Sequence, residues 1–173
     1  MTEKIHLFSA FPERIRASSK RPDLLYYRVP EHYAIQGPLP AQLVQSILLH
    51  FSGQSIAVCG GAPDLQLMQN KSVSITPVYA LEPNGPLAVP TGLVFVRFKE
   101  GINAETQDQA LASAGYTITD IPPYATHTAW VRHQSEDIAA ALTHLSSLET
   151  LSDVVNVEPQ MLTKAARRNN PST

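Results

Sequence analysis

Apolar and polar positions follow the clearest pattern in the second half of the chain. Residues 93–98 form a run of β-branched, aromatic and other apolar residues interrupted by Arg97, which predicts a strand. Residues 104–114 are rich in Ala, Gln and Glu and stop at Gly115, which predicts a helix. Ser135 is the expected N-cap of a second helix. The expected order is strand, helix, strand, strand, helix, strand, over residues 93–98, 104–114, 116–121, 128–132, 135–145 and 154–158.

This order indicates an α+β fold. It is typical of the ferredoxin-like βαββαβ arrangement, an antiparallel four-stranded sheet with two helices on one face. We therefore expect a ferredoxin-like domain over residues 87–162, followed by an extended tail over residues 163–173. The tail contains few large apolar residues and has no apolar periodicity.

The first half of the chain gives a weaker pattern. Residues 1–86 are expected to form a small α+β region of unassigned fold, with a helix over residues 43–51 after Pro40. Candidate strands cover residues 4–8, 24–29, 55–59 and 73–81. The prolines and glycines between residues 83 and 92 are the strongest cluster of breakers, so the main boundary is placed there.

Composition and charge exclude several classes of protein. With 13 basic and 15 acidic residues in 173, the formal net charge is -2, which argues against a general nucleic-acid binder. The longest strongly apolar stretch, residues 43–51, is too short to span a bilayer, so no membrane partner is expected. The first six residues do not have the pattern of a secretory signal. We expect a cytoplasmic protein, or a secreted one whose leader has been removed.

Candidate catalytic and metal-binding residues are few. Cys59 is the single cysteine, and its position at the end of an apolar strand favours a buried thiol over a nucleophile paired with histidine. The six histidines lack the spacing of a helical zinc site. Gly60 and Gly61 are not followed by the Lys-Ser/Thr of a phosphate-binding loop. The sequence therefore predicts no enzyme activity, no metal and no cofactor.

Four segments of the second half, in this order, carry a resemblance to a known family. They are the Thr-Gly and Val-Arg-Phe run within residues 89–101, the helix stop and strand start at 114–116, the small-residue helix at 137–142, and the Val-Glu-Pro strand at 154–159. Together they resemble the prodomains of subtilisin-like serine proteases (subtilases), over residues 89 to about 162. The first 85 residues have no such resemblance.

The resemblance implies an inhibitor and folding chaperone, since the glycine-rich motifs of the catalytic triad are absent from this sequence. In the family, the sheet of the prodomain packs on the catalytic domain and its tail occupies the substrate cleft like a product. The corresponding tail residues here are Thr163, Lys164, Ala165, Ala166 and Arg167.

Asp120 and Glu158 are the expected carboxylates of the sheet interface, where a carboxylate can cap a helix N-terminus of the partner. An ordinary solvated strand end is the other interpretation of Asp120. Trp130 is either an interface anchor or a core residue, and its apolar neighbours favour the core. The alternative function is a non-catalytic regulatory or adaptor module that binds a protein or a small ligand through its sheet. A cysteine-dependent enzyme is the third hypothesis.

Overall fold

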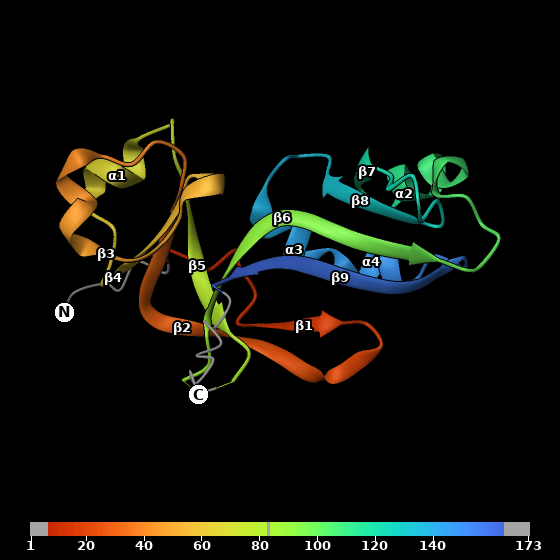
Figure 1. Cartoon of the computed structure of the whole chain (residues 1–173), viewed down its shortest axis with the longest axis horizontal. Coiled ribbons are helices and arrows are strands. Elements are labelled where there is room, and N and C mark those ends of the chain that lie inside the picture. The colour runs from red at the N-terminus through yellow and green to blue at the C-terminus, as the bar shows by residue number, and fades with distance from the viewer. Residues whose placement is uncertain (1–6, 83, 165–173) are drawn as a thin grey trace, which may run out of the picture.

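Nine antiparallel strands form one sheet in the computed structural model, which describes residues 7–82 and 84–164 (Figure 1). The strand order is β3-β4-β2-β5-β6-β8-β7, with β1 beside β2 and β9 beside β6. The strands are β1 (Arg14–Ser18), β2 (Arg21–Gln36), β3 (Ile47–Phe51), β4 (Ile56–Gly60), β5 (Ser74–Ala80), β6 (Leu87–Phe98), β7 (Tyr116–Asp120), β8 (Thr128–His133) and β9 (Val154–Thr163). The helices are η1 (Ala41–Ser46), η2 (Ser52–Gln54), α1 (Leu65–Gln69), η3 (Ala104–Gln107), α2 (Asp108–Ser113), α3 (Ile138–Thr143) and α4 (Leu145–Glu149).

The fold class expected from the sequence is wrong. Strands make up 46% of the structure and helices 22%, and the sheet curls into a half-barrel instead of forming a ferredoxin-like βαββαβ unit behind a small α+β region. The reason is that β6 and β9 are longer than expected, and the added residues of β6 pair with β5 of the first half. The first residues of β6 pair with both β5 and β9, so one sheet includes strands from both halves. The boundary between residues 86 and 87 stays a prediction.

The breakers Pro90 and Gly92 lie inside β6 and do not end it. Gly92 has a φ of 87°, and the pairing of β6 with β9 shifts register between Pro90 and Val94. The side-chain amide of Gln36 donates a hydrogen bond of 2.9 Å to the carbonyl of Pro90. The irregularity therefore bends a central strand in the manner of a bulge, where proline and glycine are tolerated.

Several local predictions are confirmed and others are wrong. All four strands expected in the second half are present, but β9 continues through Pro159. The helix expected over residues 43–51 is wrong, because η1 is followed directly by β3. The N-cap of α3 is Asp137, whose side chain accepts from the Ala139 amide, and not Ser135. Strand β1 was not expected. Of the first candidate strand, residues 7 and 8 lie in a turn and residues 4–6 lie outside the described residues.

The helices of the second half cover one face of β6, β7, β8 and β9, which we call the inner face. Strand residues of this face pack with Leu111, Ala141 and Leu148 of the helices in one buried cluster; they include Val94, Val96, Phe98, Ala129, Val131 and Val157. In Figure 1, α3 and α4 lie behind β6 and β9. The opposite, outer face of these four strands is the one turned toward the viewer.

Candidate protein-binding surface

Strand alternation directs a distinct set of side chains to the outer face. In β6, Val94, Val96 and Phe98 are buried on the inner face, whereas Leu93 and Phe95 are half-buried and Arg97 is exposed. Because paired residues of neighbouring strands share a face, the register defines rows across the sheet. One row contains Asp120 of β7, Trp130 of β8, Phe95 of β6 and Glu158 of β9. A pair of aromatic rings therefore has a carboxylate at each end of its row.

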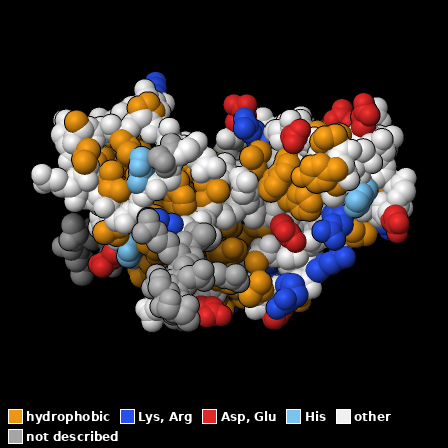
Figure 2. All heavy atoms as spheres, viewed as in Figure 1, with side chains coloured by type: hydrophobic (Ala, Val, Ile, Leu, Met, Phe, Trp, Pro, Cys, Tyr) orange, Lys and Arg blue, Asp and Glu red, His pale blue; other side chains and the backbone are white. Residues whose placement is uncertain are grey.

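The aromatic rings of Phe95 and Trp130 contact each other at the centre of this row. Their centroids are 5.2 Å apart at an interplanar angle of 61°, an edge-to-face contact that aromatic pairs favour. Both side chains are half-buried, so the interpretation of Trp130 as a core residue is wrong. Figure 2 shows an apolar patch over β6 and β8, bordered by acidic and basic side chains. Half-buried aromatic residues within a charged rim are typical of protein interfaces.

Glu158 is held in place by its neighbours on β9 and β1. Its Oε1 accepts a hydrogen bond of 2.6 Å from Nδ2 of Asn156. The Oδ1 atom of Asn156 accepts in turn from the hydroxyls of Ser18 and Ser19, at 2.7 and 3.0 Å. Burial, and then the charge of Glu158, raise the pKa of Tyr26. This carboxylate is therefore an oriented group on the outer face.

Asp120 lies at the end of β7 and is exposed, after a bulge between Ile118 and Asp120. The hydroxyl of Thr119 donates a hydrogen bond of 3.1 Å to the Trp130 carbonyl, which ties this end of β7 to β8. Two strands separate Asp120 from Glu158, so the two carboxylates do not form a single acid pair. They lie at opposite borders of the aromatic patch.

Two arginines that the sequence analysis did not select lie in the adjacent rows. Arg97 pairs with Thr128 and Arg132 pairs with Leu93, on either side of the aromatic row. Arg132 lies 3.6 Å from Glu136 in an exposed ion pair, which contributes little to stability. The signal was present as the alternation of Leu93, Phe95 and Arg97, but that pattern does not show which face the helices cover.

The predicted cleft-binding tail begins at the end of β9. Thr163 is still part of this strand and pairs with Ala88 of β6, so it is not free to extend. Lys164 follows the strand and is exposed. Ala165, Ala166 and Arg167 lie outside the described residues.

Other candidate sites have poorer geometry. Cys59 is fully buried, and burial raises the pKa of its thiol while the Tyr33 hydroxyl opposes this shift. The same burial, with a contribution from Cys59, raises the pKa of Tyr33 to about 12. A buried thiol that resists ionisation is a poor nucleophile. Within residues 7–82 and 84–164, no three His, Cys, Asp or Glu side chains lie close enough to hold a metal ion.

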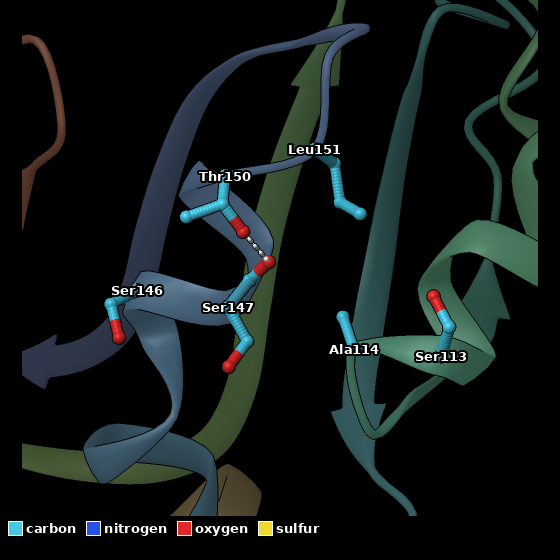
Figure 3. A pocket seen from close by; sticks show the side chains of 6 residues that line it. All are labelled: Ser113, Ala114, Ser146, Ser147, Thr150 and Leu151. Atoms are coloured by element: carbon cyan, nitrogen blue, oxygen red, sulfur yellow. Dashed lines mark hydrogen bonds between the residues drawn. The ribbon is translucent and has the colours of Figure 1, made fainter.

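A shallow hollow of about 300 Å³ lies between α2 and α4 (Figure 3). It is lined by Ser113, Ala114, Ser146, Ser147, Thr150 and Leu151. The Ser113 hydroxyl already donates to the carbonyl of Ala110, and that of Thr150 to the carbonyl of Ser147. With no charged group in its lining and a wide opening to solvent, the hollow lacks the enclosed, mostly apolar walls of small-molecule sites.

Comparison with protein-family models, with characterised proteins and with solved structures finds no match to this chain. None of the described helices is long and apolar enough to cross a membrane.

Proposed function

We propose that this chain is a non-catalytic, prodomain-like inhibitor and folding chaperone of a subtilisin-like serine protease. The observation that carries the proposal is the row Asp120, Trp130, Phe95 and Glu158 on the outer face. The resemblance of residues 89–159 to subtilase prodomains supplies the class of partner. A catalytic domain packed on this face would bury about 800 Å² on each side of a standard interface.

The arrangement of the row suggests how each group contributes. Trp130 and Phe95 are the apolar anchors, because large aromatic side chains provide most of the binding energy at interfaces. Asp120 and Glu158 accept hydrogen bonds from helix N-termini of the protease, where free amides and the helix dipole favour a carboxylate. Glu158 is already oriented by Asn156, which lowers the entropy lost on binding.

The segment after β9 provides the second part of the interaction. Lys164 to Arg167 enters the substrate cleft and adds main-chain hydrogen bonds to a cleft strand, as in β-strand addition. Pairing of Thr163 with Ala88 fixes the starting point of this segment. Since Thr163 belongs to the sheet, the inhibitory contacts begin at Lys164.

The test is a titration of a subtilisin-type protease with the full chain and with two variants. A chain that ends at Lys164 keeps all of β9 but removes the rest of the tail. The variant Trp130→Ala removes an anchor and is expected to weaken inhibition about 30-fold, the effect of losing about 2 kcal/mol at an interface hot spot. Tyr27→Ala is the matched control, because Tyr27 is an exposed aromatic residue of β2, 45% accessible, outside the outer face.

Tight inhibition that both the truncation and Trp130→Ala weaken, with Tyr27→Ala unchanged, supports the proposal. Thermal unfolding of each variant shows whether a loss of inhibition reflects a loss of fold. If the folded full chain does not inhibit and is not cleaved, the inhibitor proposal fails. The outer face would then point to the adaptor, whose binding survives removal of the tail.

A further inference from the structure

A long segment of the first half contains no charged side chain. Between Glu31 and Asp64, residues 33–63 include a single histidine and no Lys, Arg, Asp or Glu. All 28 charged residues (13 basic and 15 acidic) lie outside this stretch. The segment forms η1, β3, η2, β4 and the end of β2. The side chains of this segment therefore offer no charge with which to attract a polyanion or an acidic peptide.

Strand β3, which belongs to this segment, is the last strand at one end of the sheet. It pairs with β4 and, among the described residues, with no other strand. An edge strand presents unpaired backbone amides and carbonyls, and proteins commonly protect such edges with charged residues or proline. Residues 47–51 contain neither, and the one irregularity of the strand is a register shift in its pairing with β4 between Ile47 and Leu49. The strand at the other end, β7, instead carries exposed Thr117 and Thr119 and ends at Asp120.

Exposed apolar side chains lie on β3 and on η1 and α1, the two short helices that share a hydrophobic cluster with it. Leu48 on β3 is 59% accessible and Val44 on the preceding η1 is 63% accessible. Leu65 and Met68 of α1 are also exposed. These are four of the six large apolar residues that are exposed in the described chain; the other two are Tyr27 and Tyr124. The clustering of these exposed apolar residues on η1, β3 and α1 indicates a surface that a binding partner covers.

We propose that two copies of this chain associate through β3, with the two strands antiparallel across a two-fold axis. Such an interface is isologous, so residues close to the two-fold axis meet their own copies, and a charge there would lie beside the same charge of the other copy. An uncharged edge avoids that repulsion, which makes it complementary to itself. Pairing satisfies the free backbone groups of both β3 strands, and Leu48 and Val44 of each copy are buried against the other.

The association does not involve the outer face. Strand β3 is separated from β6, the nearest strand of the aromatic row, by β4, β2 and β5. A dimer would therefore present two separate outer faces, and each could bind its own partner. This inference stands or falls independently of the proposed inhibition.

Sedimentation velocity of the full chain, from low to high micromolar concentration, tests the proposal. The expected result is a concentration-dependent dimer. Leu48→Lys places a charge at the edge and is expected to weaken dimerisation at least about tenfold. Val44→Lys is a second variant outside the strand, so a defect of β3 itself cannot explain both. Tyr124→Lys is the control, because Tyr124 is 90% accessible in the loop between β7 and β8.

A monomer at every concentration overturns the proposal, as does a dimer that Leu48→Lys and Val44→Lys leave unchanged. A monomer that binds neutral lipid vesicles, with binding lost in Leu48→Lys, assigns the surface to a membrane instead. A monomer in which Leu48→Lys lowers the unfolding temperature shows that another part of the same chain covers the edge. Thermal unfolding of the dimer-defective variants must match the wild type for their monomeric state to support the proposal.

Discussion

His133 lies against a second histidine and a buried tyrosine. Its Nδ1 lies 2.7 Å from the Ser135 hydroxyl and accepts from the Ser135 amide at 3.2 Å. Its ring is stacked on that of His144, with centroids 5.1 Å apart, and makes an edge-to-face contact with Tyr116, with centroids 5.3 Å apart. Burial lowers the pKa of His133, the charge of His144 lowers it further, and Asp137 opposes the shift. The folded protein thus favours the neutral ring.

This environment predicts that stability falls in mild acid. Below the ordinary histidine pKa of about 6.5, the unfolded chain binds a proton that folded His133 resists, so unfolding becomes easier until the lower folded pKa is reached. Above that range, His133 has no effect on the pH dependence. Urea unfolding at a series of pH values should show that the free energy of unfolding falls less in acid for His144→Gln. The reason is that this variant removes the charge of His144, one of the two causes that lower the pKa of His133. An unchanged slope in His144→Gln, with a normal His133 pKa by NMR, would contradict this account.

At the scale of elements, local patterns were sufficient to locate most strands but not their lengths. The β-rich run at residues 93–98 is the end of β6, and the expected strand at residues 154–158 is the start of β9. The local pattern predicts strand breaks at Pro90 and Gly92. This prediction fails because the effect of these residues depends on a partner strand that the pattern does not show. In the structure they form an irregularity supported by Gln36, from a strand 54 residues away in sequence. A contact of that range leaves no local pattern.

The candidate site was predictable to a similar degree. Asp120 and Glu158 were selected through the family resemblance, yet nothing in the sequence placed them in one row with Phe95 and Trp130. That row depends on the register of β7, β8, β6 and β9, including the bulge before Asp120. A shift of one residue in any strand would send its side chains to the other face.

Gly92 offers a direct test of the bend in β6. An alanine at this position would adopt a φ of 87°, which is unfavourable for any residue with a side chain, and its Cβ would lie 3.1 Å from Cγ1 of Ile138. Gly101 is the matched control, because its φ is 83° but a Cβ there meets nothing within 4 Å. We expect Gly92→Ala to lower the free energy of unfolding by about 2–3 kcal/mol, and Gly101→Ala by about 1 kcal/mol. Urea unfolding measures both; equal effects would show that α3 does not constrain the bend.

At the scale of the whole molecule, the two halves depend on each other unequally. The cluster between the helices and the inner face consists of buried residues between Val94 and Val157, all from the second half. In the first half, Ala34, Ile56, Val58 and Val78 instead pack with Val89 of β6. Leu87 and Leu162 pack against the same cluster. Two core residues of the first half, Ile15 and Tyr79, also pack with Leu142 of α3.

This asymmetry predicts different behaviour for fragments of the chain. A fragment of residues 87–173 keeps its main cluster and should unfold cooperatively, although at a lower urea concentration because Leu142 loses Ile15 and Tyr79. A fragment of residues 1–82 loses Val89, Leu87 and Leu162 from its core and should show no cooperative transition. Circular dichroism during urea unfolding measures the transition of each fragment, with the full chain as the reference. The opposite result would be a cooperative first half and an unfolded second half. It would mean that the inner-face cluster cannot maintain the outer face by itself. The aromatic row would then depend on the half-barrel as a whole.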